Sequence, residues 1–213
     1  MFDQLRKFIY FAVIFDISMK QKAIYIGALV AALSGSQAFA QAKNFEGFSF
    51  AAGLNIANTT FSRAYAGAAG YSVNGTQANA VAQAHYDYAA SEQFVLGFGA
   101  TADSGKLPFG IWQPSNIEIQ MKDRYSVYVA PGYTLNDSTL LYGKLAYITA
   151  IVSDPRASEL PGVGYGVGLK ILAGSHLFYQ VELSGTDYAK REYINTKDTF
   201  DLKVLTLSIG YKF

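Results

Sequence analysis

Few side chains in this sequence could do chemistry, and its two histidines are the first to weigh. His85 stands beside Gln83 and Asp87, whereas His176 lies in a short stretch with no acidic neighbour to orient it. A nucleophile activated by histidine needs such a third group, and a zinc site needs several His, Cys or carboxylate ligands. Cysteine is absent, which excludes thiolate sites and disulfides. We therefore expect no enzyme, no metal site and no cofactor.

Four charged residues stand among apolar and small neighbours: Asp87, Lys144, Lys170 and Glu182. Each falls on the polar face of an expected strand, at a similar distance from the nearest expected short turn. Charges removed from water persist only when they are paired. We therefore predict that the four form a lumenal ion-pair network, which either fills the interior of a barrel or gates a path through it.

The elements that position these charges are expected to be strands, because apolar residues alternate with small or polar ones at period two. The alternating segments are 47–56, 81–88, 94–101, 125–134, 141–147, 163–171, 179–184 and 204–213. The signal is weakest in 81–88, whose apolar face is mostly alanine. Eight strands are therefore predicted.

The expected connections differ in length in a regular way. Three are short, at 90–93, 136–138 and 173–176, and four are long, at 58–75, 104–123, 153–161 and 186–200. Long and short connections alternate along the chain. This pattern is typical of a transmembrane barrel with short periplasmic turns and long extracellular loops.

A soluble barrel, with apolar residues inside and polar residues outside, is the alternative. The polar face of these strands is rich in glycine and small residues rather than Lys and Glu, so it would face water poorly. Tyrosines recur near strand ends, as in an interfacial girdle: Tyr86, Tyr88, Tyr133, Tyr147 and Tyr211. We predict an all-β fold, an eight-stranded antiparallel transmembrane β-barrel that closes on itself because lipid offers no hydrogen-bond partners.

The last strand carries its apolar residues at alternate positions and ends on an aromatic one. These residues are Leu205, Leu207, Ile209, Tyr211 and Phe213. This ending resembles the C-terminal signal of bacterial outer-membrane barrels, which the barrel-insertion machinery reads. We expect the same role for it here.

The N-terminal stretch 1–40 is expected to be a cleavable signal peptide. Lys20 and Lys22 precede the apolar run 23–33, and Ala38-Phe39-Ala40 has the small-residue form of a cleavage site. Met19 followed by Lys20 has the form of a natural start. The barrel is then expected to occupy residues 41–213.

Several motifs resemble the outer-membrane β-barrel family, which includes the opacity-protein-related surface antigens and the OmpA-like transmembrane barrel. The motifs are Pro131-Gly132-Tyr133, Leu135-Asn136-Asp137, the run 141–147, the run 164–170 and Val181-Glu182-Leu183. The resemblance implies a barrel in the bacterial outer membrane, in contact with lipid and lipopolysaccharide. We expect no periplasmic domain. The resemblance leaves the function open, because such barrels include adhesins, immune-evasion proteins, envelope-stabilising proteins and weak porins.

Two functions therefore remain open. In the first, the barrel is a surface-exposed scaffold with a filled lumen, whose loops serve envelope structure, adhesion or surface-antigen roles toward an extracellular ligand. In the second, it is a narrow porin-like channel, which the glycines Gly164, Gly166 and Gly168 would favour and Tyr128, Tyr142 and Lys144 would oppose. A net charge of +1 argues against nucleic-acid binding.

The expected long loops contain apolar residues that could contact a partner, dip into the lipopolysaccharide layer or pack on other loops. These candidate loop contacts are Phe61, Tyr65, Tyr71, Phe109, Ile111 and Trp112.

Overall fold

The computed structural model describes residues 41–112, 117–153 and 158–213, so the expected signal peptide lies outside the described residues. The described part forms a short 3-10 helix, η2, and ten strands. Their bounds are η2 Gln41–Asn44, β1 Gly47–Tyr65, β2 Ala68–Ala89, β3 Phe94–Asp103, β4 Leu107–Trp112, β5 Ile117–Asn136, β6 Thr139–Ser153, β7 Ser158–Ala173, β8 Leu177–Tyr188, β9 Arg191–Tyr193 and β10 Thr196–Lys212. No helix among these residues is long and apolar enough to cross a membrane.

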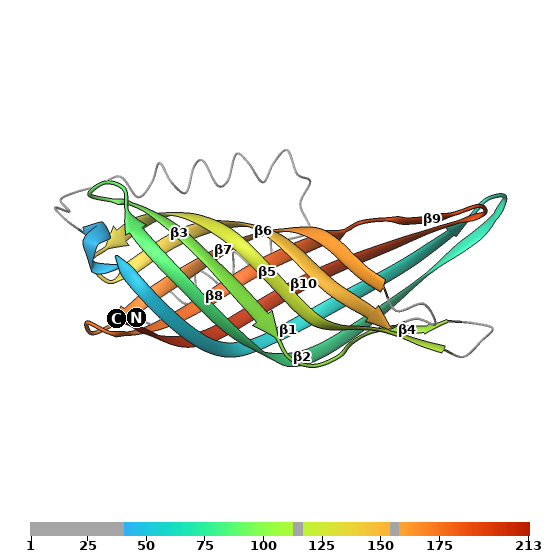
Figure 1. Ribbon diagram of the computed structural model, residues 1–213, viewed down its shortest axis with the longest axis horizontal. Coiled ribbons are helices and arrows are strands. Elements are labelled where there is room, and N and C mark those ends of the chain that lie inside the picture. The colour runs from blue at the N-terminus through green and yellow to red at the C-terminus, as the bar shows by residue number, and fades with distance from the viewer. Residues whose placement is uncertain (1–40, 113–116, 154–157) are drawn as a thin grey trace. The chain divides into compact units, whose positions relative to one another are not determined.

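Eight of the strands close into a ring, and they run obliquely along the molecule (Figure 1). They are hydrogen-bonded in the order β1-β2-β3-β5-β6-β7-β8-β10, and β1 pairs with β10 to complete the circle. Every pairing is antiparallel, while β4 pairs only with β5, and β9 with β10, as additions to the ring. The predicted eight-stranded antiparallel barrel is confirmed.

The three short turns lie at one end of the barrel, here called the short-turn end. They connect β2 to β3, β5 to β6 and β7 to β8 at the predicted positions. Gly174 has φ 87°, a left-handed conformation that glycine adopts without a steric penalty.

The bounds predicted for three of the four long connections are wrong, because the strands continue far into them at the opposite end, here called the hairpin end; residues 154–157 of the fourth connection lie outside the described residues. Residues 58–75 form the end of β1, a tight turn at Gly67 (φ 80°) and the start of β2. Most of 104–123 belongs to β4 and β5, and most of 186–200 to β8, β9 and β10. Backbone pairing extends these strands: β1 stays paired with β10 as far as Tyr65 opposite Thr196.

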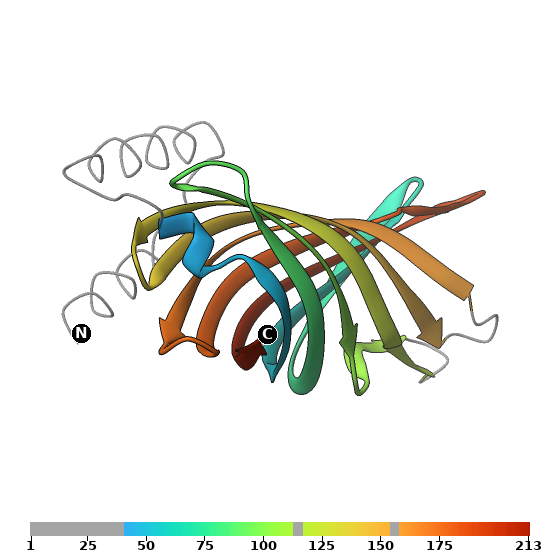
Figure 2. The ribbon, with the colours of Figure 1, turned by 60° about the vertical axis from the view of Figure 1, so that its left-hand side comes forward.

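The outward face of the strands carries a belt of large apolar side chains. Leu54, Val127, Leu145 and Tyr147 are 56–60% exposed, and the predicted outward residues Leu207, Ile209, Tyr211 and Phe213 are 44–68% exposed. Alternate residues point inward and are buried, as Ser49, Gln83, Thr206 and Ser208 are. Figure 2 shows the strands curving around this interior. An apolar exterior around a polar interior is the pattern of a barrel in lipid rather than in water.

Candidate functional site

Inside the barrel, toward the short-turn end, a buried cluster is centred on Lys170 of β7. Lys170 Nζ lies 2.6 Å from Asp87 Oδ2 and 2.5 Å from His85 Nε2, and both partners come from β2. Ser49 Oγ of β1 lies 2.8 Å from the same His85 nitrogen. An ammonium group can only donate, so His85 Nε2 accepts and the imidazole is neutral. The β2–β3 and β7–β8 turns bring these elements to the same depth.

A second cluster lies beside the first and is centred on Glu182 of β8. Lys144 Nζ of β6 donates to Glu182 Oε1 at 2.9 Å, and the Tyr142 hydroxyl donates to Oε2 at 3.0 Å. The ammonium group also lies 4.5 Å from the centre of the Tyr128 ring. The structure therefore brings the four predicted network residues together as two pairs, Lys170–Asp87 and Lys144–Glu182.

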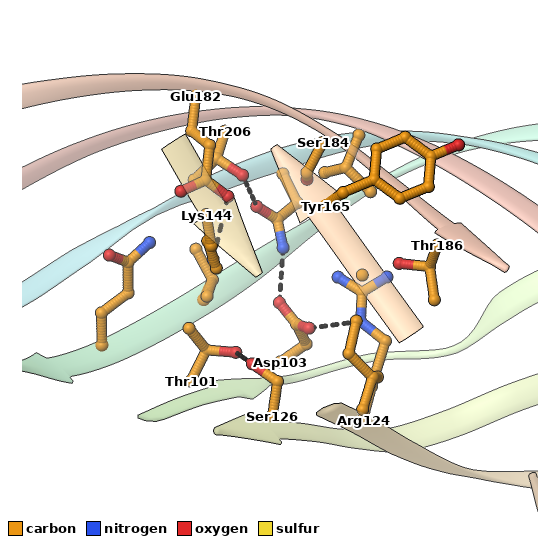
Figure 3. A pocket seen from close by; sticks show the side chains of 16 residues that line it. Thr101, Asp103, Arg124, Ser126, Lys144, Tyr165, Glu182, Ser184, Thr186 and Thr206 are labelled. Carbon is orange, nitrogen blue, oxygen red and sulfur yellow. Dashed lines mark hydrogen bonds and ion pairs between the residues drawn. The ribbon is translucent and has the colours of Figure 1, made fainter. Parts of the chain in front are cut away.

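A third charged pair, which sequence reasoning missed, consists of Asp103 and Arg124 (Figure 3), and Asp103 stands at the end of β3 that is away from the short turns. Arg124 Nε of β5 lies 2.5 Å from Asp103 Oδ2 of β3. Asn55 donates to the other Asp103 oxygen and accepts from Thr206 Oγ1, at 2.6 Å in the second case. The sequence did carry a signal for this pair, because Asp103 follows Thr101 and Arg124 precedes Ser126 at period two, on the polar face of their strands. Both residues fell at the edge of a segment expected to be a loop.

The cavity between the second and third pairs is small. Its volume is about 40 Å³, and its walls include Asp103, Arg124, Lys144 and Glu182 (Figure 3). A buried water needs roughly 10–15 Å³ of such volume, so the cavity has room for only a few waters. The lumen at this level is a packed polar layer rather than an opening. The three ion pairs and their hydrogen-bond partners are called the lumenal polar layer below.

The lumen glycines do not leave an open path. A Cβ at Gly168 would collide with the Tyr142 ring, and one at Gly164 would collide with Ile148. Gly210 is covered in the same way by the ring of Phe178, which is itself 1% exposed. The glycines therefore make room for large neighbouring side chains, which fill the space.

An apolar cluster closes the lumen beyond the polar layer at the hairpin end, and it is called the outer apolar cluster. Its members are Ala57, Phe61, Leu107, Phe109, Met121, Ala146, Ile148, Ala150, Val152, Leu160, Tyr188, Phe200, Leu202 and Val204. Leu107 and Phe109 come from β4, which is held against β1 because Thr59 Oγ1 donates to the Pro108 carbonyl at 2.7 Å. The strand β4 thus folds over the lumen and contributes to its closure.

The outer apolar cluster corrects two of the candidate loop contacts. Phe61 is 1% exposed and Phe109 is 0% exposed, so the expectation that they are presented to a partner is wrong. They are buried because the strands that carry them curve over the lumen instead of forming loops. Tyr71 packs against the cluster, with its ring centre 5.9 Å from that of Phe61 and 6.4 Å from that of Tyr65. The side chains of Ile111 and Trp112 lie outside the described residues.

A smaller apolar cluster, the inner apolar cluster, closes the short-turn end. It consists of Ala42, Phe45, Val95 and Leu140, with Ala89 and Leu172 packed against it. Ala42 lies in the helix η2 and Phe45 directly follows it, and the Ala42 amide donates to the Glu92 carbonyl at 3.0 Å. Lys212 Nζ donates to the carbonyl of Asn44 at 2.8 Å and holds the same segment to the last strand. Residues 41–45 therefore cap this end of the lumen.

At the hairpin end, parts of four strands continue as a sheet, which is called the outer extension. It consists of residues 58–65 of β1, residues 68–75 of β2, the strand β9 and residues 196–203 of β10. Arg63 binds Asp198 through two contacts of 2.6 Å each, with both side chains largely buried. Lys197 and Glu192 form an exposed pair at 2.6 Å. The hydrogen bond from Lys197 lowers the pKa of Glu192. The extension is thus held by backbone pairing and by charge pairs that differ in burial.

The second histidine lies at the short-turn rim. His176 Nδ1 is 3.0 Å from the Lys212 carbonyl, and its ring stacks on Tyr211 with ring centres 5.3 Å apart. Among the described residues, no group of three or more His, Asp or Glu is arranged to hold a metal ion.

The chain was compared with known proteins. Residues 26–213 match the model of a family described as the outer membrane protein beta-barrel domain. None of the curated protein sequences compared with the chain matches it. The family match spans every described residue.

Several solved structures are similar to this one. They include Ail of Yersinia pestis (17% identity, 79% of this chain and 99% of that chain, TM-score 0.43). They also include Neisserial surface protein A (14%, 79% and 98%, TM-score 0.47) and OprG of Pseudomonas aeruginosa (12%, 79% and 96%, TM-score 0.47).

Proposed function

Because the chain belongs to the outer membrane protein β-barrel family, we propose that it is a surface scaffold, a closed barrel that holds the outer extension outside the bacterial outer membrane. In this architecture the short turns face the periplasm and the longer connections face outward. The observation that carries the proposal is that side chains fill the lumen at three successive levels. Function then resides on the outer surface rather than in a transport path.

The closure is built from three successive fillings. The inner apolar cluster covers the periplasmic end, the lumenal polar layer fills the middle, and the outer apolar cluster fills the outer part. Eight-stranded barrels have an interior just wide enough for side chains. An ion crossing this lumen would have to displace buried ion pairs and two apolar clusters, which argues against the porin-like alternative.

The outer extension offers the surface for recognition. Its outward face is polar: Asn58 Nδ2 donates to Thr76 Oγ1 at 3.4 Å, and Ser62 Oγ donates to Ser72 Oγ at 3.0 Å. A rigid sheet that presents hydroxyl and amide groups can bind a ligand without first paying the entropy of ordering a loop. We infer that an extracellular ligand contacts this face.

The geometry of the buried histidine supports a role without catalysis. Ser49 and His85 are hydrogen-bonded, but Asp87 lies 3.5 Å from the same imidazole nitrogen that faces Ser49. A catalytic acid would orient the histidine through its other nitrogen. Ser49 is also 1% exposed inside the lumen, where no substrate reaches it.

Planar-bilayer conductance of refolded residues 41–213 tests the proposal. We expect no steady channels, with folding verified separately by a heat-dependent shift on a gel. A matched variant, Phe45→Ala together with Phe109→Ala, removes one large side chain from each apolar cluster and should give brief or small openings. Steady, salt-dependent channels from the unaltered protein would replace the scaffold with the porin-like function.

A further inference from the structure

His85 of β2 is a titratable side chain enclosed in the lumen. It is 4% exposed, and its neighbours are Ser49 on β1, Lys170 on β7 and the ring of Phe178 on β8. Histidine is the side chain whose charge ordinarily changes between pH 5 and 8. The cluster around Lys170 is therefore the part of the lumenal polar layer that a moderate change in pH can alter.

Two groups hold the Lys170 ammonium while the imidazole is neutral. Asp87 Oδ2 accepts from Lys170 Nζ at 2.6 Å, and His85 Nε2 accepts at 2.5 Å. A neutral imidazole that accepts through Nε2 carries its proton on Nδ1. His85 Nδ1 is buried and has no hydrogen-bond partner among the described residues. The acceptor of the imidazole is thus committed to Lys170, whereas its donor is left unsatisfied.

Protonation reverses the role of His85 Nε2. An imidazolium donates through both nitrogens, so Nε2 would face the Lys170 ammonium as a second donor and a second positive charge. Asp87 Oδ2 lies 3.5 Å from Nε2 and can accept from it. A small movement of the two β2 side chains then forms a His85–Asp87 ion pair at the expense of Lys170.

We propose that His85 is an acid-sensitive latch inside the barrel, whose protonation transfers Asp87 from the Lys170 ammonium to the imidazolium. The proton comes from solution, and no covalent bond other than the new N–H changes. The latch controls how the lumen is filled and does not depend on what the outer extension binds. The inference therefore goes beyond the scaffold function.

Further charges face the cluster from other strands, and none of them replaces the lost acceptor. Lys144 of β6 and Lys212 of β10 act on the cluster as positive charges, and an ammonium group cannot accept a hydrogen bond. Glu182 of β8 is already held by Lys144 and by the Tyr142 hydroxyl. Asp87 is therefore the carboxylate for which the imidazolium and the ammonium compete.

The released ammonium lies next to the inner apolar cluster. Lys170 is opposite Leu140 of β6, which is a member of that cluster. A buried ammonium without an acceptor is costly, so Lys170 has to move past Leu140 toward water at the short-turn end. We therefore expect acid to loosen residues 41–45, which cap this end.

The thermal midpoint of refolded residues 41–213 in detergent, measured from pH 8 to pH 5, tests the proposal. A histidine that must be neutral in the folded protein makes stability fall as the pH drops, and we expect a fall of about 4 °C or more. His176→Gln alters the exposed histidine at the short-turn rim and is the matched control, so it should show the same fall. His85→Gln keeps an acceptor for Lys170 and cannot become charged, so its midpoint should be constant over this range. An equal fall for His85→Gln, or a constant midpoint for the unaltered protein, would overturn the proposal.

The variant Lys170→Met separates the latch from a general sensitivity to acid, because the expected effect changes sign. Without the ammonium group Asp87 has lost its cation at pH 8, and protonation of His85 supplies a new one. The midpoint of Lys170→Met should therefore be low at pH 8 and should rise as the pH falls to 5. A fall as large as that of the unaltered protein would contradict the transfer of Asp87.

Amide hydrogen exchange of residues 41–45, corrected for the intrinsic effect of pH, follows the cap directly. We expect faster corrected exchange at pH 5 than at pH 8 in the unaltered protein and in His176→Gln, and no change in His85→Gln. The same acceleration in His85→Gln would show that the cap responds to acid without the latch and would overturn the proposal.

Discussion

The two halves of the barrel interior are filled in opposite ways. Next to the inner apolar cluster, which covers the short-turn end, the filling is polar, with Lys170–Asp87 and Lys144–Glu182 contributed directly by the ring strands. Toward the outside it is apolar and includes Leu107 and Phe109 from β4, which lies outside the ring. The polar filling is therefore stable only if every charge keeps its partner, whereas the apolar filling depends on one added strand staying folded inward.

The largest expected effect comes from breaking a pair in the polar half. Glu182→Ala leaves the Lys144 ammonium and the Tyr142 hydroxyl without their acceptor, and loss of one partner of a buried pair costs about 3–5 kcal/mol. We expect a clear fall in the urea midpoint and in the thermal midpoint of the detergent-folded protein. Glu159→Ala, which removes an exposed carboxylate, is the control and should leave both unchanged. An unaltered midpoint for Glu182→Ala would show that the pair does not support the fold.

In the apolar half we also expect a loss of stability, but one that is confined to the region around β4. Phe109→Ala removes a side chain that is 0% exposed, and such a truncation costs about 3 kcal/mol or more in a packed core. Because β4 pairs only with β5, we expect faster amide hydrogen exchange in β4 and little change in β7 or β8. Uniformly faster exchange around the ring would mean that the two fillings are a single cooperative unit.

The contrast between the halves also explains which predictions from sequence succeeded. Period-two alternation depends on one face meeting lipid, so it located the eight ring strands and the inward placement of Asp87, Lys144, Lys170 and Glu182. The interpretation failed where the two faces of a strand no longer differ in polarity. Beyond the membrane both faces of a strand can be polar, and the stretch 58–75 therefore has the composition of a loop.

The burial of Phe61 and Phe109 had no local signal. Their burial follows from long-range pairing, since β10 holds β1 and β5 holds β4 over the lumen. Composition alone cannot show whether an aromatic residue outside the alternating segments covers a lumen or faces solvent. Arg124 and Asp103 were predictable by contrast, because each extends the polar face of its strand by one step.

A smaller effect is expected in the outer extension, where Asp198→Asn weakens the two-contact pair with Arg63. Hydrogen bonds between charged groups contribute about 1.5–3 kcal/mol when they are well buried, and Asp198 is 3% exposed. We expect faster amide exchange in β1 beyond Asn58 and in the start of β10, with the thermal midpoint of the barrel nearly unchanged. Exchange rates equal to those of the unaltered protein would show that backbone pairing alone holds the extension.

The smallest effect is expected at the exposed pair of Glu192 and Lys197 in the outer extension. The hydrogen bond from Lys197 lowers the pKa of Glu192, so any stability it gives is present above the unfolded pKa and is lost as the pH falls through the folded value. Glu192 is exposed, however, and solvent screens the pair. We therefore expect Glu192→Gln to leave the unfolding midpoint unchanged at neutral pH and to leave its acid dependence unchanged. A midpoint for Glu192→Gln that no longer falls in acid would show that this exposed pair contributes to the acid dependence of stability.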